Sequence, residues 1–256
     1  MVDLNLLKIL HQKESMSNKI RVLAIIPARG GSKGIKKKNL KKILGKPLIY
    51  YPIKSALKSG VCDDIFVSTD DKEIAKISKK YGADVPFLRK KKYSGDLVST
   101  EKTLKNALIE YEKIKKQKYD ICVFLTCTNI FRKFIFIKNA VDNLKKNKKI
   151  ESSFVVKKLY RHFWHIKKNK FKKVLPWMKN YTSRQVAPKL YREETGVALA
   201  SRAWLWRKGK RIGSKVKFIY NDFPFSEIDI NNKYDLELAT NAMKLLKKQK
   251  KIKEML

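Results

Sequence analysis

Short apolar runs recur along the chain, separated by segments in which apolar positions have helical spacing. In the first half, runs typical of strands lie at 21–27 (RVLAIIP), 64–70 (DIFVSTD) and 119–128 (YDICVFLTCT). Nearly every position of the first run is apolar, as in a strand buried on both faces. Segments with helical periodicity lie between these runs and after them, at 47–60, 71–82, 99–116 and 135–146. This alternation predicts an α/β fold with a mostly parallel sheet.

The second half of the chain interrupts this pattern. A further strand is predicted at 152–156, and no regular period follows in 157–189, which we interpret as an inserted arm. Strands are then predicted at 195–201, 215–220 and 226–231, followed by an amphipathic helix at 234–248 and a lysine-rich end expected to fray. We therefore predict an α/β domain made of 19–156 and 190–248, preceded by an unstructured leader at 1–18.

The Asp70-Asp71 pair ends the second predicted strand and precedes a helical segment. Asp71 is a good N-cap residue, and Gly82 is well placed to end the same helix. A structural role is therefore favoured for Asp71, although both carboxylates also stand where parallel sheets bind ligands.

Composition adds an extreme positive charge, with 61 Lys and Arg against 23 Asp and Glu, a formal net charge of +38. One interpretation is an acidic partner such as nucleic acid. The other is compositional drift, which we favour because lysines occur on nearly every segment instead of forming one stripe. The three cysteines match no zinc pattern and favour a reducing, cytoplasmic setting. No apolar run approaches the ~20 residues of a membrane span, so no membrane association is expected.

The loop after the first strand, 28–39 (ARGGSKGIKKKN), combines glycines with an arginine and many lysines. Glycines allow backbone N–H groups to approach phosphate oxygens, and Arg29 and Lys33 add charge-assisted hydrogen bonds. The spacing matches neither the Walker A nor the dinucleotide-binding pattern. From these residues alone, a phosphate site and a solvated turn both remain open.

Ordered motifs resemble the acylneuraminate cytidylyltransferases, the CMP-sialic acid synthetase family that includes legionaminic and pseudaminic acid cytidylyltransferases. The first motif is IIPARGGSKGI with Lys38-Asn39, and further matches fall at 44–49, 67–75, 81–89, 95–100, 190–199 and 227–239. The resemblance spans residues 20–240. It implies a Rossmann-like three-layer fold of the nucleotide-diphospho-sugar transferase type, and a homodimer formed through the arm.

The resemblance also implies a reaction. CMP passes from CTP to the anomeric hydroxyl of a nonulosonic acid, pyrophosphate leaves, and the CMP-sugar serves surface glycan synthesis, for example of lipopolysaccharide. Arg29, Lys38 and Asp229 match the expected catalytic positions. The expected nucleotide-binding positions are Ala28, Arg29, Gly30, Ser32, Lys33, Asn39, Ser68 and Thr69.

Mg²⁺ is the cofactor that the resemblance implies, held by Asp229 and Asn231. Many family members carry a second aspartate where this chain has Asn231, which weakens the expected metal site. The expected sugar-binding residues are Thr126, Thr128, Arg132, Arg184, Gln185 and Arg192. Thr126 replaces a glutamine that the family associates with the sugar, so a legionaminic or pseudaminic acid fits at least as well as sialic acid.

Other interpretations stay open on the sequence alone. Phe163, Trp164 and Trp177 of the arm are either dimer anchors or packing residues, and His162 and His165 lack a third metal ligand at a useful spacing. The enzyme alternatives are another nucleotide, another sugar acid, or an impaired relative, given Thr126 and Asn231. A nucleic-acid-binding protein is disfavoured because no nucleic-acid module is recognisable.

Overall fold

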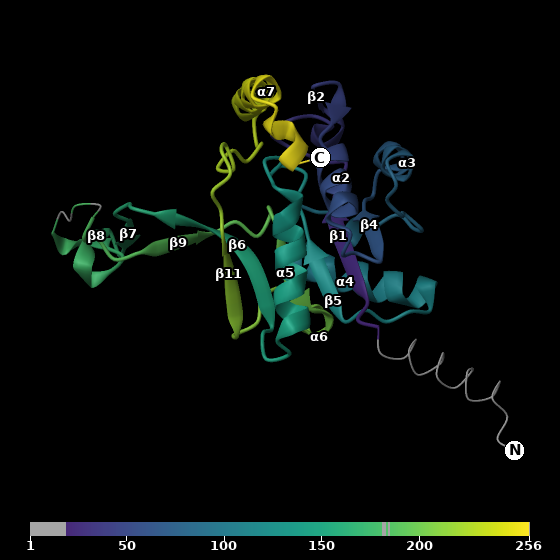
Figure 1. Ribbon diagram of the computed structural model, residues 1–256, viewed down its shortest axis with the longest axis horizontal. Helices are drawn as coiled ribbons and strands as arrows, with labels where there is room; N and C mark the ends of the chain where they lie inside the picture. Colours follow the sequence, from purple (N-terminus) through teal and green to yellow (C-terminus); the bar gives the residue numbers. More distant parts are fainter. Residues whose placement is uncertain (1–18, 181–182, 184, 256) are drawn as a thin grey trace, which may run out of the picture.

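The computed structural model describes residues 19–180, 183 and 185–255 (Figure 1). Its centre is a seven-stranded sheet in the order β11-β6-β10-β5-β1-β4, with β9 paired to the outer part of β6. The strands of this sheet are β1 (Val22–Pro27), β4 (Asp64–Ser68), β5 (Ile121–Phe124), β6 (Ser152–Leu159), β9 (Leu190–Glu193), β10 (Leu199–Arg202) and β11 (Val216–Tyr220). All except β9 and β10 run in one direction, which confirms the prediction of a mostly parallel α/β sheet.

Helices cover both faces of the sheet and complete three layers (Figure 1). One apolar core unites the sheet with α2, α3, α5 and α7, and a second unites it with α4 and α6. β1 shows why its run is apolar throughout: Val22, Ala24 and Ile26 enter the first core, and Leu23 and Ile25 the second. The helices are α2 (Tyr50–Ser59), α3 (Lys72–Lys80), α4 (Thr100–Lys115), α5 (Phe134–Lys146), α6 (Ala203–Arg207) and α7 (Lys233–Lys248).

The boundaries of α3 follow the predicted capping signals. The Asp71 carboxylate accepts hydrogen bonds from the Glu73 and Ile74 amides, at 2.7 and 2.9 Å, and so caps the start of α3. Gly82 has a φ of +96° just after this helix, a conformation that glycine adopts at little cost. The favoured structural role of Asp71 is therefore confirmed.

Two predictions at the C-terminal end are wrong. Residues 226–231 form no strand, because the preceding residues are Pro224 and Phe225, which has a φ of +63°, and hydrogen bonds local to this segment replace a ladder. The described part of the lysine-rich end, up to Met255, is folded, contrary to the expected fraying. A 3₁₀ turn, η4 (Lys251–Glu254), folds back and buries Met255, whose carbonyl oxygen accepts a hydrogen bond from Ser55 at 3.1 Å.

The described residues between β6 and β9 extend away from the helices and contain regular structure, although the sequence shows no regular period there (Figure 1). Strands β7 (Trp164–Lys167) and β8 (Lys170–Lys173) form a hairpin, which the 3₁₀ turn η3 (Pro176–Lys179) follows. Figure 1 places β7 and β8 at the tip, away from the helices. The remaining short elements are η1 (Lys38–Leu40), β2 (Lys42–Ile43), β3 (Lys46–Pro47) and η2 (Lys91–Tyr93).

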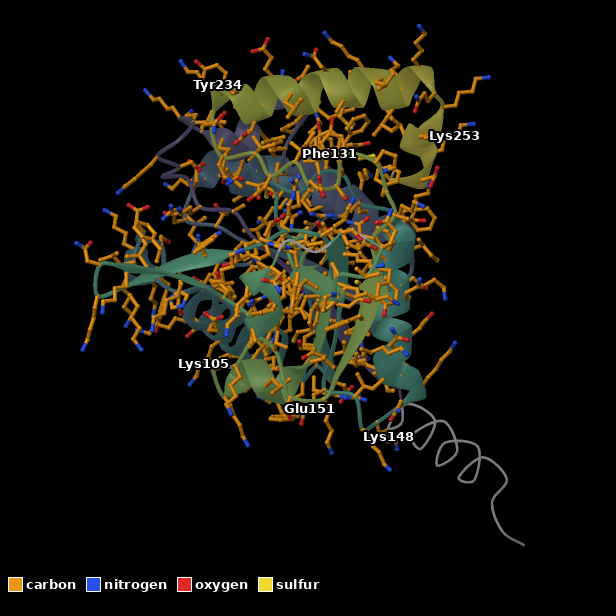
Figure 2. The ribbon with its side chains drawn as sticks, turned by 90° about the vertical axis from the view of Figure 1, so that its left-hand side faces the viewer. Lys105, Phe131, Lys148, Glu151, Tyr234 and Lys253 are labelled. Atoms are coloured by element: carbon orange, nitrogen blue, oxygen red, sulfur yellow. The ribbon has the colours of Figure 1, made fainter. Side chains whose placement is uncertain are left out.

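Lysine side chains project from many sides of the molecule (Figure 2). Lys105 on α4, Lys148 after α5 and Lys253 in η4 extend from well-separated parts of the surface. This distribution fits the prediction that the positive charge is spread over the chain. None of the helices in the described part of the chain has both the length and the apolar character needed to cross a membrane.

Candidate functional site

The basic loop, residues 28–39, leaves the carboxyl end of β1, beside the ends of β4 and β5. Two side-chain contacts fix its path. The Gly30 amide donates to the Asp70 carboxylate at 2.9 Å, and the Asn39 amide group donates to the Arg29 carbonyl oxygen at 2.9 Å. Asp70 is thus a residue that holds the loop, from the position where parallel sheets commonly bind ligands.

The far end of the loop reaches the segment before α7. Gly34 lies so close to the backbone of Asn231 that an added Cβ would collide with the Asn231 carbonyl oxygen, which explains the need for glycine. The Lys38 ammonium donates to the Ile230 carbonyl oxygen at 2.8 Å and to Asn231 Oδ1 at 3.5 Å. Burial lowers the pKa of Lys38, and the Asp229 carboxylate opposes that shift.

These contacts enclose a pocket of about 330 Å³, which we call the Lys38 pocket. It brings together predicted site residues from three distant parts of the sequence, the basic loop, the turn after β5 and the segment before α7. Its lining is Pro27, Arg29, Ser32, Lys33, Gly34, Lys38, Asn39, Thr126, Cys127, Thr128 and Asn231. A small cavity with several convergent cations suits a polyanionic ligand such as a chain of phosphates.

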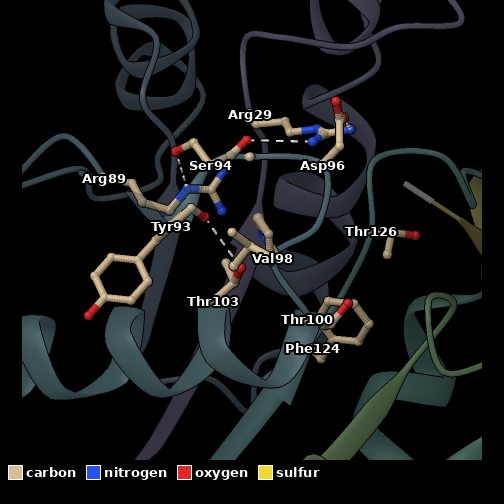
Figure 3. Close-up of a pocket in the computed structure, with 12 residues that line it drawn as sticks. Arg29, Arg89, Tyr93, Ser94, Asp96, Val98, Thr100, Thr103, Phe124 and Thr126 are labelled. Atoms are coloured by element: carbon tan, nitrogen blue, oxygen red, sulfur yellow. Dashed lines mark hydrogen bonds and ion pairs between the residues drawn. The ribbon is translucent and has the colours of Figure 1, made fainter. Parts of the chain in front are cut away.

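A second pocket of about 300 Å³ adjoins the first and shares Pro27, Arg29 and Thr126 with it (Figure 3). We call it the Arg89 pocket. Arg89 is almost fully buried, and its Nε donates to the Ser94 hydroxyl at 3.1 Å. Burial lowers the pKa of this guanidinium, whereas the Asp70 carboxylate raises it. The other lining residues are Tyr93, Ser94, Gly95, Asp96, Val98, Thr100, Thr103 and Phe124.

Asp96 joins the two pockets electrostatically. One carboxylate oxygen lies 2.7 Å from Arg29 Nη2 and the other lies 2.8 Å from Lys33 Nζ. The hydrogen bond to Lys33 is the main cause that holds the pKa of the Asp96 carboxyl below its ordinary value. Neither Arg89 nor Asp96 was among the predicted site residues. The signal available was that both lie inside motifs of the family resemblance, at 81–89 and 95–100.

The predicted metal ligands lie at the edge of the Lys38 pocket. The Asp229 carboxylate is exposed and accepts a hydrogen bond from Asn231 Nδ2 at 3.0 Å. Within the described residues, no cluster of three or more His, Cys, Asp or Glu side chains has the arrangement of a metal site. Mg²⁺ commonly takes one or two protein oxygens and completes its shell with water and phosphate, a requirement that the Asp229 carboxylate can meet. Asn231 turns its Nδ2 toward Asp229 and its Oδ1 toward the Lys38 ammonium, so its oxygen does not face the Asp229 carboxylate.

Four of the predicted nucleotide-binding residues line neither pocket, namely Ala28, Gly30, Ser68 and Thr69. Ala28, Ser68 and Thr69 are buried, and the Thr69 hydroxyl accepts a hydrogen bond from the Asp71 amide at 3.1 Å. The Ala28 amide donates to the Ser68 carbonyl oxygen at 2.9 Å. This placement supports a structural role in joining the loop to β4, and it does not support direct contact of these side chains with a nucleotide.

Arg132, a predicted sugar ligand, is fully buried behind the Lys38 pocket. Its Nη2 donates to the carbonyl oxygens of Thr126, Asn129 and Gly196, at 2.6, 2.6 and 2.9 Å. Burial lowers the pKa of this guanidinium to about 9. Arg132 therefore holds the turn that carries Thr126 through Nη2, while its Nε and Nη1 have no hydrogen-bond partner among the described residues, and the sugar contact stays a prediction.

The other predicted sugar ligands divide between the pocket and the arm. Thr126 and Thr128 line the Lys38 pocket, and the Thr126 hydroxyl contacts Asn129 Oδ1 at 2.7 Å. Arg192 lies on β9 and pairs with Glu194 at 2.6 Å, and Gln185 is exposed on the arm, so neither reaches these pockets within the chain. Arg184 lies outside the described residues.

Comparison with known proteins agrees with this geometry. The family model described as "Cytidylyltransferase" matches residues 23–252, nearly the whole chain. The chain belongs to the cytidylyltransferase family. Pseudaminic acid cytidylyltransferase of Campylobacter jejuni is 44% identical over 126 residues, 49% of this chain and 53% of the relative. CMP-N,N'-diacetyllegionaminic acid synthase of Legionella pneumophila is 40% identical over 123 residues, 48% of this chain and 53% of the relative. These matches thus span about half the length of each relative.

A longer match extends over most of a further relative. Post-translational flagellin modification protein B of Campylobacter coli is 28% identical over 224 residues, 87% of this chain and 95% of that protein. Among solved structures, CMP:2-keto-3-deoxy-manno-octonic acid synthetase complexed with CTP has a TM-score of 0.65 at 14% identity, covering 88% of this chain and 99% of that one. This structural likeness confirms that the fold is that of a cytidylyltransferase.

Proposed function

We propose that this protein transfers CMP from CTP to the anomeric hydroxyl of a nonulosonic acid and releases pyrophosphate. The observation that carries the proposal is the convergence of Arg29, Lys33 and Lys38 on one pocket beside Asp229 and Asn231. Cations that converge beside oxygen ligands for a divalent metal suit a triphosphate. Membership of the cytidylyltransferase family, with relatives named for pseudaminic and legionaminic acids, gives the reaction its class.

In this proposal one CTP molecule occupies both pockets, which meet at Arg29. The base enters the Arg89 pocket, where the buried guanidinium offers N–H donors to the carbonyl and ring nitrogen of a pyrimidine. The ribose lies near Arg29, and the triphosphate extends along the basic loop. Asn39 contributes by holding the Arg29 carbonyl group, and with it the path of the loop.

In the reaction the anomeric oxygen forms an ester bond to the α-phosphate as the bond between the α- and β-phosphates breaks, pyrophosphate leaves and the hydroxyl proton passes to solvent. No covalent bond to the protein is needed, so positioning and charge stabilisation suffice for catalysis. Arg29 and Lys33 bind the phosphates that leave as pyrophosphate, and Lys38 stabilises the charge that develops near the α-phosphate. Mg²⁺, when bound, would be held by Asp229 and the Asn231 side-chain oxygen, and it would neutralise part of the triphosphate charge. Lys38 is already oriented for its role by its hydrogen bond to Ile230.

The acceptor sugar is placed on the Thr126 and Thr128 side of the Lys38 pocket. Two of the relatives named above act on pseudaminic and N,N'-diacetyllegionaminic acid, so an acid of this type is the proposed substrate, and its activated form would serve glycan synthesis. We also propose a homodimer joined through the arm. A cytoplasmic setting is proposed because Cys62, Cys122 and Cys127 are all free thiols.

The proposed function is tested by measuring pyrophosphate release with CTP, Mg²⁺ and a panel of pseudaminic, legionaminic and N-acetylneuraminic acids. Each component is omitted in turn, and UTP and ATP replace CTP in parallel reactions. We expect release that requires CTP and one of the acids. The Arg89→Ala variant should raise the KM for CTP, whereas Lys90→Ala, at an exposed neighbouring position, should not. Folded protein that binds no CTP would refute the proposal.

A further inference from the structure

The two cations assigned to the triphosphate are already paired with a carboxylate of the chain itself. Asp96 binds Arg29 through one oxygen and Lys33 through the other, at 2.7 and 2.8 Å. A phosphate group that approaches the same nitrogens competes with this carboxylate, because each carboxylate oxygen already lies at hydrogen-bonding distance from one of them. Asp96 therefore competes with any phosphate chain for this end of the basic loop.

The surroundings of Asp96 allow such a replacement. About two fifths of the Asp96 side chain is exposed, and the side chain of the next residue, Leu97, is fully exposed. The side chain of Lys33 is exposed by about four fifths. In contrast, Asp70 on the other side of the loop holds the Gly30 backbone amide and does not pair with the Arg29 or Lys33 side chain.

We propose that Asp96 is a specificity-determining residue that acts as an exchangeable counterion for Arg29 and Lys33, displaced only by ligands that carry a pyrophosphate group. This inference rests on the proposed function, because it assumes that these cations bind the phosphates of CTP. CTP offers two phosphates beyond the α-phosphate and can replace both ion pairs. CMP lacks them, so it occupies the nucleotide pocket with Asp96 still in place.

Competition between Asp96 and pyrophosphate also affects product release. Once the bond to the α-phosphate is broken, pyrophosphate holds Arg29 and Lys33 without support from the nucleoside, and Asp96 competes with it for the same nitrogens. Asp96 thus weakens the binding of substrate and by-product alike. Weaker ground-state binding does not slow catalysis when CTP is abundant, and it shortens the residence of pyrophosphate.

The test compares wild-type protein with Asp96→Asn and Asp96→Ala by calorimetric titration with CTP, inorganic pyrophosphate and CMP, each with Mg²⁺. We expect both variants to bind CTP and pyrophosphate about 3- to 10-fold more tightly, the effect of removing one or two partly exposed ion pairs. The affinity for CMP should change by less than about 2-fold, because CMP lacks the phosphates that compete with Asp96. In the pyrophosphate-release assay, inhibition by added pyrophosphate should strengthen by the same factor.

Asp142→Asn is the matched control, because Asp142 pairs with Lys138 at 2.6 Å on α5, a helix that contributes no residue to either pocket. It should leave all three affinities unchanged. Weaker CTP binding by Asp96→Asn would overturn the inference and assign Asp96 a direct contact with nucleotide or metal. If Asp96→Asn bound CTP and CMP more tightly by the same factor, Asp96 would not discriminate between them, and the inference would be overturned. If wild-type protein binds neither CTP nor pyrophosphate, the proposed function itself fails, and this outcome is distinct from the others.

Discussion

The ammonium nitrogen of Lys38 lies 2.8 Å from the carbonyl oxygen of Ile230, and this hydrogen bond joins residues 192 positions apart. It connects the basic loop to the segment that carries both proposed metal ligands, Asp229 and Asn231. Gly34 makes the same connection through the backbone, because only a residue without a Cβ fits against Asn231. The basic loop and the segment that carries the proposed metal ligands are therefore one unit of structure.

Replacing Lys38 should change both the rate and its dependence on pH. We expect Lys38→Met to lower kcat/KM about 100-fold, a typical loss when one preorganised charge donor is removed. Burial lowers the pKa of Lys38, so its charged form is lost at a lower pH than for an ordinary lysine. The wild-type rate should therefore fall as the pH rises through that lowered pKa.

Lys38→Arg should move this alkaline fall to higher pH, since a guanidinium keeps its proton there. The check is a pH profile of kcat/KM from the pyrophosphate-release assay. Lys42→Arg, at an exposed position of β2, serves as the control and should leave the profile unchanged. An alkaline fall at the same pH in wild type and Lys38→Arg would assign it to a different group.

The pairing of Asp229 with Asn231 predicts a change in metal dependence. Asn231→Asp supplies a second carboxylate beside the first, at the cost of the hydrogen bond that Asn231 Nδ2 donates to Asp229. Added ligand charge strengthens the binding of a hard cation, so half-maximal activity should need about 10-fold less Mg²⁺. Asp229→Asn should require far more Mg²⁺. Magnesium titrations at saturating CTP measure both effects, and an unchanged requirement in both variants would place the metal elsewhere.

Much of this architecture could be predicted from the sequence because local pattern determines it. A strand buried on both faces must be apolar throughout, as β1 is, and an Asp before a helical segment satisfies the free amides of the first turn, as Asp71 does. The basic loop is likewise continuous in sequence. Its residues Arg29, Ser32, Lys33, Lys38 and Asn39 all line the Lys38 pocket.

The features that sequence could not supply depend on contacts between distant segments. Asp96 meets Arg29 only because the turn after η2 folds over the loop, and the motif at 95–100 marks this turn without indicating the contact. Arg132 looks like a surface arginine at the start of a helix, yet three carbonyl oxygens draw it into the interior. The apolar residues of 226–231 alternate as in a strand, although Ile230 serves to dock the segment against Thr128 through its amide.

The burial of Arg132 predicts a stability defect. Arg132→Ala leaves the carbonyl groups of Thr126, Asn129 and Gly196 without their shared donor and opens a cavity, so the free energy of unfolding should fall by about 3–5 kcal/mol. Arg132→Met should lose less, because it fills the space without burying a charge. Urea unfolding measures these values. Lys133→Ala, which removes surface ion pairs to Asp222 and Glu254, should cost less than about 1 kcal/mol, and a similar cost for Arg132→Ala would contradict the assignment.

The arm carries an exposed apolar face through which we expect two copies of the chain to associate. Trp164, Ile166 and Phe171 share one face of the β7–β8 hairpin, because Trp164 and Ile166 alternate along β7 and Ile166 pairs with Phe171. These side chains are 58%, 66% and 71% exposed, a concentration of apolar surface that typically marks a protein interface. Because the chain is strongly positive, lysine-rich surfaces of two copies would repel each other. Apolar contact between these side chains would therefore have to hold the dimer together.

Wild-type protein should therefore have twice the chain mass of 29.9 kDa in light scattering after gel filtration. The triple variant Trp164→Ser, Ile166→Ser, Phe171→Ser should elute as a monomer at low micromolar concentration with its unfolding transition intact. Its matched control is Ile109→Ser with Ile114→Ser, which removes exposed apolar residues from α4 and should stay dimeric. A monomeric wild type, or a triple variant that remains dimeric, would show that the hairpin face serves another purpose, because an interface built on these three side chains cannot survive their removal.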